Sequence, residues 1–238
     1  ASHGTHVAGI IAGRGRPPSG LRGLAPRVTL RSYRVFGKNA EGASNYDIIK
    51  AIDQAVADGC DLINMSLGGG PLDDAMSAAI EEARSSGTLV IVAAGNEYRS
   101  PVSFPASDPL AIAVSAMGRR GTFPKGSTEA GDISRPYGKD RKNFIAAFSN
   151  IGPELDLTGP GVGVLSTVRG GYAPMSGTSM ACPAVTGFAA KMLSMPGHRN
   201  ILNMPRDQAR SDVMAQALLQ AAKSLGFGPR YEGKGLPL

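Results

Sequence analysis

The sequence predicts an α/β protein of three layers, in which helices cover both faces of a mostly parallel central sheet. Two apolar runs of strand length, over 88–94 and 111–116, are typical of strands that are buried on both faces. Helical patterns lie between the expected strands, as the crossovers of parallel strands require, since a tight hairpin cannot join parallel neighbours. A chain of 238 residues is an ordinary length for one such domain, so we expect a single domain over 1–238.

The first half of the chain supplies a helix and then a strand–helix–strand series. Residues 5–12 are small or β-branched and fit either a strand or a buried helix; we expect the helix, with Ser2 as its N-cap. Apolar and polar side chains partly alternate over 28–36, which predicts a strand. A helix over 45–58 should end at Gly59 and lead into a strand over 60–65.

The same unit recurs in the second half, where a helix over 73–86 should end at Gly87 before the strand at 88–94. Residues 118–143 are polar and rich in Gly, Arg, Lys and Asp, which predicts a surface insertion. The remaining expected elements are short strands near 144–148, 155–157 and 164–168, a buried helix over 179–195 and an amphipathic helix over 207–225.

Composition excludes several classes of protein. Hydrophobic residues make up 42% of the chain and charged residues 18%, which is typical of a folded domain and not of a disordered chain. The 25 basic and 19 acidic residues give a net charge of +6, but the basic residues are not interleaved with aromatic ones, so no nucleic-acid partner is expected. No apolar run approaches the ~20 residues of a membrane span.

Two features of the chain bear on its cellular context. Cys60 and Cys182 are two thiols in a long chain, so we expect small buried side chains and no disulfide framework. The chain begins Ala-Ser-His, without an initiator methionine or signal sequence, and we expect its natural N-terminus to lie upstream.

Three short segments carry candidate catalytic residues: His3 in SHGTHVAG, Asn96 in VAAGN and Ser179 in SGTSMACP. A serine at a helix start is more often a cap than a nucleophile, but small neighbours such as Gly177 allow a sharp turn that leaves the hydroxyl exposed. A serine hydroxyl also needs a neutral imidazole to accept its proton.

Two other histidines compete with His3 for the role of base. His6 lies three residues further along the same expected helix, where a buried structural histidine is favoured, and His198 follows a Pro-Gly turn and is expected at the surface. Asn96 could donate its amide N–H, together with the backbone N–H of Ser179, to a developing oxyanion; the alternative is a turn residue after Gly95.

The chain order of these residues separates the known triad arrangements. The order Ser, acid, His of the α/β-hydrolases fails, because no Asp or Glu lies between Ser179 and His198 and GTSMA lacks the closing glycine of GxSxG. The chymotrypsin order His, Asp, Ser is permitted, but that class is all β, whereas this chain predicts βα units. The order Asp, His, Ser remains, with its Asp upstream of Ala1.

Four linked motifs, HGTHVAG, INMSLGG, AAGN and SGTSMACP, occur here in the order and spacing of the subtilisin-like serine proteases, the subtilases of peptidase family S8. FSNIGPELDLTGPG and GKGL also resemble that family. The resemblance implies a subtilisin-like fold for 1–238, cut so that the first strands and the triad Asp are missing. It implies His3 as general base, Ser179 as nucleophile and Asn96 as oxyanion donor, in a serine endopeptidase that forms an acyl-enzyme intermediate.

The segment INMSLGGG predicts how substrate binds, since an extended peptide could pair with the strand end at Ser66, Leu67 and Gly68. The resemblance places Ala93, Ala94 and Gly95 along the primary specificity pocket, with Ser103 near its base. Main-chain pairing and a roomy apolar slot predict broad specificity with a preference for apolar residues before the scissile bond.

The resemblance also bears on cofactors, partners and location. Catalysis needs no cofactor, and the basic loop GRGRPPSGLRGLAP lacks the Asn-rich sequence that many relatives use for structural calcium, so the sequence gives no support for a metal site. The expected partners are protein or peptide substrates and a propeptide or inhibitor, with no membrane span. A monomer that is secreted or extracytoplasmic is expected, with an intracellular location as the alternative.

Two other functions remain open from the sequence. The first is a binding domain that has kept the fold and groove without turnover, and intact His3, Asn96 and Ser179 argue against it. The second is a protein that binds anionic surfaces. Without the triad Asp, the isolated chain is expected to be nearly inactive, and exposed core would lower its stability.

Overall fold

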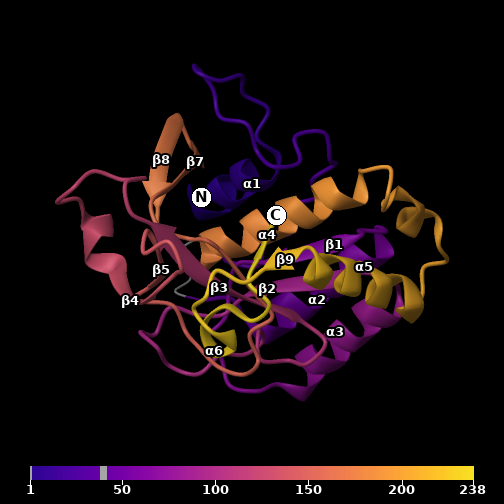
Figure 1. The fold of residues 1–238 in the computed structure, drawn as a ribbon. Helices are drawn as coiled ribbons and strands as arrows, with labels where there is room; N and C mark the ends of the chain where they lie inside the picture. Colours follow the sequence, from indigo (N-terminus) through magenta and orange to yellow (C-terminus); the bar gives the residue numbers. More distant parts are fainter. Residues whose placement is uncertain (1, 38–41) are drawn as a thin grey trace.

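The computed structural model describes residues 2–37 and 42–238. Their helices and strands form the expected α/β/α layers, with α1 and α4 above the central sheet in Figure 1 and α2 and α3 below it. The helices are α1 (Ser2–Ala12), α2 (Asn45–Ala57), α3 (Asp74–Ser85), α4 (Thr178–Leu193), α5 (Gln208–Gln220) and α6 (Pro229–Glu232), with 3-10 turns η1 (Thr128–Asp132) and η2 (Arg199–Asn203). The strands are β1 (Leu62–Met65), β2 (Leu89–Ala93), β3 (Ile112–Arg119), β4 (Ile133–Tyr137), β5 (Asn143–Ala146), β6 (Leu157–Pro160), β7 (Val164–Val168), β8 (Gly171–Met175), β9 (Ala222–Lys223) and β10 (Leu236–Pro237).

The central sheet has six strands in the order β1-β2-β3-β5-β4, with β6 paired to β3 beside this path. Strands β1, β2, β3 and β6 are parallel, whereas β5 and β4 are antiparallel to their neighbours. Because Met65 lies opposite Val92, the residues that follow β1 and β2 emerge at the same edge of the sheet. That edge is where ligands bind in open α/β sheets.

Strand β2 is buried on both faces, as its continuous apolar sequence predicts. Ile91 packs into one cluster with residues of α4 and α5, and Val90 and Val92 pack into another with residues of α2 and α3. Successive side chains of a strand point to opposite faces, so a single strand joins both layers of helices. The sheet therefore contributes side chains to two hydrophobic cores, one on each face.

Local side-chain chemistry sets the ends of α2 and α3. The Ser44 hydroxyl accepts a hydrogen bond from the Asp47 N–H, and the Asp73 carboxylate accepts one from the Met76 N–H, which satisfies donors that a helix start leaves free. Gly59 and Gly87 follow the two helices with φ of 71° and 74°. Glycine adopts this left-handed conformation without the penalty of a Cβ, so both predicted endings are confirmed.

The predicted strand at 28–36 is wrong. This segment is extended but belongs to no strand of the described structure, and an isolated bridge between Phe36 and Ala43 is the pairing that it makes. Most of its side chains are exposed. Alternation of apolar and polar residues fits a strand only where a neighbouring strand takes up the backbone N–H and C=O groups, and no described strand lies against this segment.

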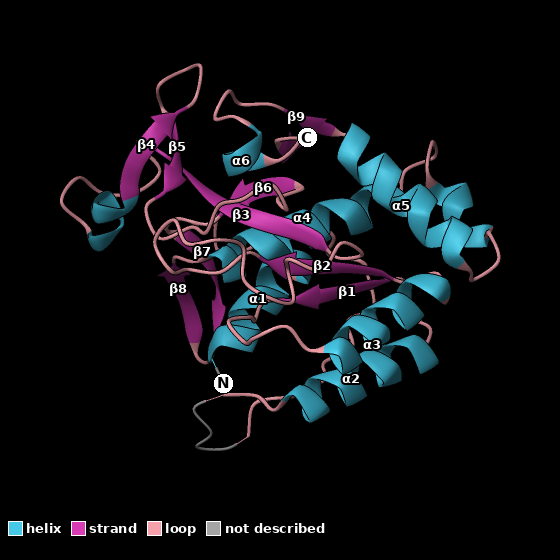
Figure 2. Ribbon diagram, turned by 90° about the horizontal axis from the view of Figure 1, so that it is seen from below, coloured by secondary structure: helices cyan, strands magenta, loops and turns pink. Residues whose placement is uncertain are grey.

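Three smaller predictions need correction. Ser2 is not an N-cap, because α1 already includes it. The segment 118–143 is largely exposed, as expected, but it is not only a loop, since β4 pairs with β5 and extends the sheet, as Figure 2 shows. The last long helix, α5, is shorter than the predicted 207–225, because after Gln220 the chain turns to form β9.

Strands β7 and β8 form a hairpin that holds α1 in place. The Ser166 hydroxyl donates to the carbonyl of His6 at 2.7 Å, and the Thr167 hydroxyl donates to the carbonyl of Thr5 at 2.8 Å. The His6 ring nitrogen Nε2 lies 3.0 Å from the carbonyl of Ala173. These bonds fix the first turns of α1, and with them the position of His3.

Candidate active site

The N-terminus of α4 lies at the sheet edge where β1 and β2 end. Gly177 precedes α4 with φ of 154°, a conformation that other residues rarely adopt, and its small size lets the chain turn sharply into the helix. Ser179 is half-buried in the first turn of α4. Its hydroxyl donates to the carbonyl of Ser66 at 3.2 Å, and the Ser66 hydroxyl donates to the carbonyl of Ser179 at 2.9 Å. The structure thus ties the predicted nucleophile to the predicted substrate-binding edge.

The side chain of Asn96 is oriented by the residue before Ser179. Its Oδ1 accepts hydrogen bonds from the backbone N–H of Thr178 at 2.8 Å and from the Thr178 hydroxyl at 3.0 Å, and that hydroxyl accepts from the Gly95 N–H at 3.2 Å. With Oδ1 fixed in this way, the amide Nδ2 points away from Thr178, and no described residue accepts a hydrogen bond from it. The backbone N–H of Ser179 has no partner among the described residues either. Two N–H donors and the positive end of α4 therefore face the same space, which suits a developing negative charge.

The packing of α1 on α4 brings His3 to the level of Ser179. Gly187 is so close to α1 that a Cβ on it would lie 3.3 Å from the Ile11 Cα atom. His3 precedes Ile11 by eight residues and Ser179 precedes Gly187 by eight, and the two helices run in the same direction in Figure 1. Because both helices rise about 1.5 Å per residue, the two residues lie about 12 Å back from that contact, on neighbouring helix starts.

The electrostatic environment of His3 favours its neutral form. Partial burial lowers the pKa of the His3 imidazole below 6.5, and the nearby His6 ring lowers it further. Although neighbouring atoms partly surround the ring, His3 as a whole remains accessible to solvent. A neutral imidazole is the form that can accept a proton from a hydroxyl.

The structure separates the three histidines as the sequence analysis expected. His6 is fully buried and bonded through Nε2, while its Nδ1 is buried without a hydrogen-bond partner among the described residues. His198 lies in the turn before η2, beyond the opposite end of α4. None of the three histidine rings forms a hydrogen bond with Ser179 among the described contacts, since the Ser179 hydroxyl donates to the carbonyl of Ser66.

A buried hydrogen-bond network lies under Ser179 and joins α4 to β1. The Asn64 Oδ1 accepts from the Thr186 hydroxyl at 3.0 Å and from the Cys182 Sγ at 3.3 Å, and the Asn64 Nδ2 donates to the Ser66 hydroxyl at 3.0 Å. Cys182 is fully buried, and burial raises the pKa of its thiol to about 12. Since both donors on α4 point at Oδ1, the amide of Asn64 has one orientation, and that orientation sets the Ser66 hydroxyl against the carbonyl of Ser179.

The residues predicted for the specificity pocket also come together. Ser103 donates through its hydroxyl and its backbone N–H to the carbonyl of Ala94, at 3.1 and 3.0 Å. A Cβ on Gly68 would lie 3.4 Å from the Ser103 Oγ and 3.8 Å from the carbonyl of Ala93, so the segments that carry Gly68, Ala93 and Ser103 lie side by side. Leu67 packs on the apolar cluster beneath α2 and α3.

Gly95 leaves room for a polar group that the sequence analysis did not predict. A Cβ there would clash with Asn150, Ser103 and Glu97. The Asn150 amide donates to the Glu97 carboxylate at 2.5 Å and to the carbonyl of Ala94 at 3.2 Å, and its Oδ1 accepts from the Glu97 N–H at 2.8 Å. The Glu97 carboxylate is therefore held beside Gly95 by Asn150.

No group of three or more His, Cys, Asp or Glu side chains within 2–37 and 42–238 is arranged to hold a metal ion. Over the same residues, no helix has the length and apolarity that a membrane span needs. Cys60 and Cys182 are both free thiols, and Cys60 is only half-buried.

Comparisons with known proteins identify the family of the chain. The sequence model of the Subtilase family matches residues 1–233. The chain belongs to the subtilase family. It is 39% identical to subtilisin E of Bacillus subtilis (strain 168) over 199 residues, which are 82% of this chain and 46% of that protein. It is 37% identical over 201 residues to the thermophilic serine proteinase of Bacillus sp. (strain AK1), covering 84% of this chain and 44% of that protein.

Solved subtilase structures share the fold. The structure of Sphericase superimposes with a TM-score of 0.77 and 28% identity, covering 99% of this chain and 77% of that one. The S41 psychrophilic protease gives a TM-score of 0.76 with 30% identity. This subtilase chain spans about half the length of the curated relatives that it matches.

Sequence reasoning missed three residues beside the candidate site: Thr178, which orients Asn96, and the hydrogen-bonded pair Glu97 and Asn150. Thr178 and Glu97 are direct neighbours of Ser179 and Asn96 in the chain. Asn150 lies in the FSNIG segment, which was noted for its resemblance but given no role. Only the side-chain contacts reveal what each of them does.

Proposed function

We propose that the chain is the greater part of the catalytic domain of a serine endopeptidase, with Ser179 as nucleophile, His3 as general base and Asn96 as oxyanion donor. The observation that carries this proposal is the fixed orientation of Asn96. Thr178, directly before Ser179, holds the Oδ1 of Asn96 through two hydrogen bonds and so turns the amine toward the space in front of the serine. A structural turn residue would not need its side chain oriented by the neighbour of a serine.

The proposed reaction has two halves. The Ser179 Oγ forms a bond to the peptide carbonyl carbon while its proton passes to the His3 ring. The carbonyl oxygen becomes negative and accepts hydrogen bonds from the backbone N–H of Ser179 and from the side-chain amide N–H of Asn96. The C–N bond then breaks as the leaving amine takes the proton from His3. Water then attacks the acyl-enzyme through the same proton transfers, and the carboxylic acid product is released from Ser179.

The triad acid is proposed to come from outside these 238 residues, as an Asp that precedes His3 in the full protein. No Asp or Glu among the described residues hydrogen-bonds to the His3 ring. An imidazole without its carboxylate lacks the group that fixes its tautomer, and precedent from serine proteases puts the loss at about 10⁴-fold in rate. We therefore expect Ser179 in this chain to react slowly.

The proposed substrates are extended peptides that pair with the edge formed by Ser66, Leu67 and Gly68. The walls at Ala93, Ala94 and Gly95 are small and apolar, which supports a preference for apolar residues before the scissile bond. The Glu97 carboxylate beside Gly95 should repel acidic residues there. By resemblance to the subtilase family, an extracytoplasmic monomer that meets a propeptide or protein inhibitor is proposed.

The proposal is tested by active-site labelling. The chain is incubated with a fluorophosphonate, and modified peptides are mapped by mass spectrometry, beside Ser179→Ala and the control Ser176→Ala, which removes an exposed hydroxyl three residues away. We expect label at Ser179 in the wild type and in the control, and none in Ser179→Ala. Label on other serines, or equal labelling of native and urea-unfolded chains, would favour a binding domain without catalysis.

A further inference from the structure

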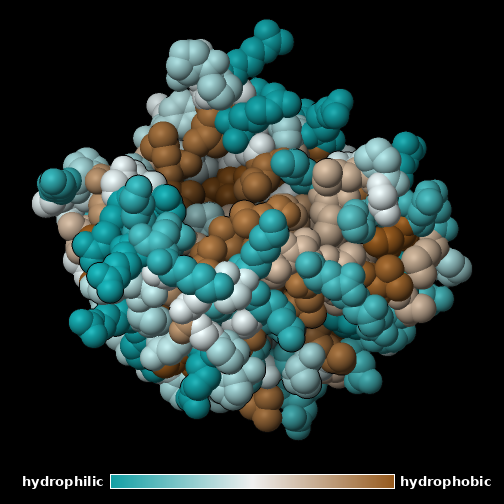
Figure 3. All heavy atoms as spheres, viewed as in Figure 1, coloured by the Kyte–Doolittle hydropathy of each residue, from teal (hydrophilic) through white to brown (hydrophobic). Residues whose placement is uncertain are grey.

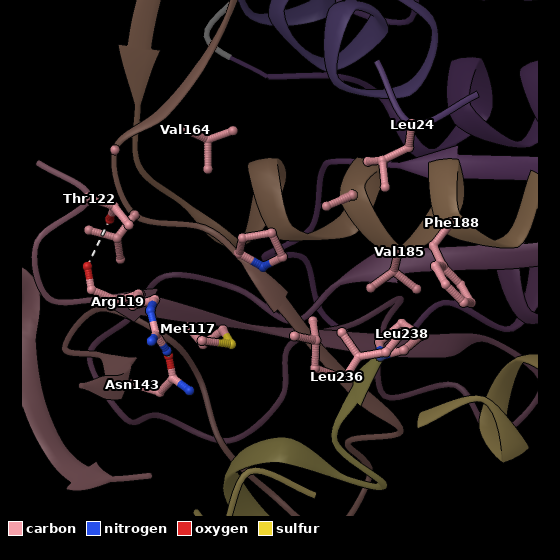
Figure 4. A pocket seen from close by; sticks show the side chains of 16 residues that line it. Leu24, Met117, Arg119, Thr122, Asn143, Val164, Val185, Phe188, Leu236 and Leu238 are labelled. Carbon is pink, nitrogen blue, oxygen red and sulfur yellow. Dashed lines mark hydrogen bonds between the residues drawn. The ribbon is translucent and has the colours of Figure 1, made fainter. Parts of the chain in front are cut away.

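Two surface hollows border the segment that follows α1. The larger has a volume of about 560 Å³ and is mostly apolar, and Leu24 of this segment lines it in Figure 4. The smaller has a volume of about 310 Å³; we call it the arginine hollow, and its lining residues are Arg14, Arg22, Pro26 and Arg27. In Figure 3, hydrophilic side chains gather at the top of the molecule, where Figure 1 places the loop after α1, and the hydrophobic floor of the larger hollow lies below them. A lining of three arginines without an acidic side chain needs a physical explanation.

The loop that carries the arginine hollow has a closely packed backbone. The Gly15 N–H donates to the carbonyl of Leu21 at 2.8 Å, and the Gly23 N–H donates to the carbonyl of Gly13 at 2.9 Å. A Cβ on Gly15 would lie 2.5 Å from the Leu21 nitrogen, and a Cβ on Gly23 would lie 2.5 Å from the Gly13 nitrogen, so neither glycine can be replaced without a shift of the backbone. The two arms of the loop are therefore in direct contact, which fixes where their side chains emerge.

This backbone sets two positive charges opposite each other. Arg14 and Arg22 form an antiparallel bridge between the two arms, and both side chains are exposed. Like charges at directly opposed positions destabilise a strand pair. The Arg14 guanidinium is also held in place, since its Nε donates to the carbonyl of Pro26 at 3.0 Å and its Nη2 donates to the carbonyl of Val28 at 3.4 Å.

No carboxylate of the described structure offsets this charge. The sequence has no Asp or Glu from position 2 to position 40, and none of the three arginines of the hollow forms an ion pair with a described residue. Arg31, only four residues beyond Arg27, does pair with Asp58 at 3.4 Å. The arginine hollow is thus an ordered cluster of guanidinium groups that has free N–H donors and lacks an anion.

We propose that the arginine hollow binds a phosphate group with at least two negative charges, such as pyrophosphate or a phosphate monoester. A guanidinium group presents N–H donors in a fixed fork that matches phosphate oxygens two at a time. A single carboxylate carries one charge and cannot offset three cations. Because the loop already holds Arg14 and Arg22 opposite each other, binding loses little conformational entropy and removes their mutual repulsion.

Nucleic acid fits this hollow less well. Each phosphodiester of a nucleic acid carries one charge, and the lining of the hollow contains no aromatic side chain on which a base could stack. The hollow is also independent of the proposed catalysis, since none of its residues belongs to the candidate active site.

Binding should be visible in the stability of α1. After the hollow, the chain returns to this helix, where the Leu24 N–H donates to the carbonyl of Ile10 at 3.1 Å and the Ala25 N–H donates to the carbonyl of Ile11 at 2.7 Å. A ligand that requires the folded loop stabilises the folded state in proportion to its occupancy. Pyrophosphate should therefore raise the Tm of the chain.

The test uses the Ser179→Ala chain, so that self-cleavage cannot affect the result. Sodium pyrophosphate is titrated into the chain by calorimetry, with sodium chloride added to keep the ionic strength constant, and the Tm is measured in parallel. The matched probe is a tri-aspartate peptide blocked at both ends, which presents its negative charges on carboxylates.

We expect saturable binding of pyrophosphate at one site, at least about tenfold tighter than binding of the tri-aspartate peptide. The variant Arg22→Gln/Arg27→Gln should weaken binding by about tenfold or more, because two of the three guanidinium groups are lost. The control Arg199→Gln/Arg230→Gln removes two exposed arginines elsewhere and should alter binding less than about threefold. In the absence of pyrophosphate, Arg22→Gln should leave the Tm unchanged or raise it, because it relieves the repulsion from Arg14.

A second arm identifies the source of the phosphate. The chain is sedimented with phosphatidylcholine vesicles that do or do not contain phosphatidic acid, a lipid whose headgroup is a phosphate monoester. Sedimentation only with phosphatidic acid, reversed by pyrophosphate, would assign the site to a lipid headgroup. No sedimentation beside saturable binding of pyrophosphate would assign it to a free phosphate compound, and both results support the proposal.

Several results would overturn it. Equal binding of the two probes, or binding that survives Arg22→Gln/Arg27→Gln, would show that the arginines do not select phosphate. A marked fall in Tm for Arg22→Gln without ligand would assign the arginines a structural role, and tighter binding of a single-stranded oligonucleotide would assign the surface to nucleic acid. If the full protein did not bind pyrophosphate, the arginines would be assigned to an acidic segment outside these residues.

Discussion

Replacing Asn64 by leucine should weaken the attachment of α4, the helix that carries Ser179, to the sheet. The Asn64 amide donates to Ser66 and accepts from Thr186 and Cys182, at 3.0, 3.0 and 3.3 Å. Leucine has a similar volume and none of these groups. Thr186 keeps a second acceptor in the carbonyl of Cys182, and the Cys182 thiol keeps one in the carbonyl of Ile91, so neither donor is left fully unsatisfied.

The expected loss follows from that count. Neutral buried hydrogen bonds contribute about 0.5–1.5 kcal/mol each, the weak thiol bond adds little, and the leucine recovers part of the loss by apolar burial. Asn64→Leu should therefore lower the free energy of unfolding by about 1 kcal/mol. The Ser66 hydroxyl loses the donor that holds it, so fluorophosphonate labelling of Ser179 should also become slower.

Chemical denaturation in urea measures the first effect and mass spectrometry of the labelled chain measures the second. The control is Asn203→Leu, at an exposed asparagine, which should change the free energy of unfolding by less than about 0.5 kcal/mol. A double-mutant cycle with Thr186→Val isolates the shared bond. Strict additivity in that cycle, or a loss no larger than that of the control, would refute the reasoning.

Three further predictions concern charged groups. Burial raises the pKa of the Asp156 carboxyl to about 6, so the folded state is penalised once this group must ionise. The contribution of this carboxyl to stability is therefore largest below about pH 4, and it is lost as the pH rises toward about 6. Relative to Asp156→Asn, the wild type should lose about 2 to 3 kcal/mol of unfolding free energy between pH 4 and 7, and parallel pH profiles of the two proteins would contradict this. Because the pKa of His3 is lowered, labelling of Ser179 should increase through an apparent pKa below 6.5, whereas a midpoint above 6.5 would show that another group controls the serine. Asp61→Asn should lower the free energy of unfolding by about 1 to 2 kcal/mol, because Arg210 is buried and pairs at 2.5 Å with that carboxylate, which is itself 45% exposed; urea unfolding that matches the wild type would contradict it.

The sequence predicted best the features that depend on nearby residues. Gly59 and Gly87 end their helices through a local backbone conformation, and the apolar run of β2 identifies a buried strand wherever it is placed. The segment at 28–36 has a strand pattern but no described partner, and β4 has a polar sequence yet pairs with β5. Strand pairing is a long-range property, so a pattern within the strand cannot establish it.

The same distinction applies to the candidate site. His3, Asn96 and Ser179 were predicted from motifs, because their residue types and small neighbours suit the chemistry and the motifs resemble those of a known family; their catalytic roles stay a prediction. Thr178 and Asn150 were missed, because each acts by orienting another side chain across a contact that the sequence does not show.

The reactivity of the two cysteines can report local opening of this fold. The Cys182 thiol is buried between α4 and strands β1 and β2, and burial raises its pKa, while Cys60 is closer to solvent. An alkylating reagent should therefore modify them at different rates, and only separation of α4 from the sheet exposes the slower one. The modification rate of Cys182 thus reports how often α4, which carries Ser179, separates from the sheet. The measurement needs no substrate and no label at the serine.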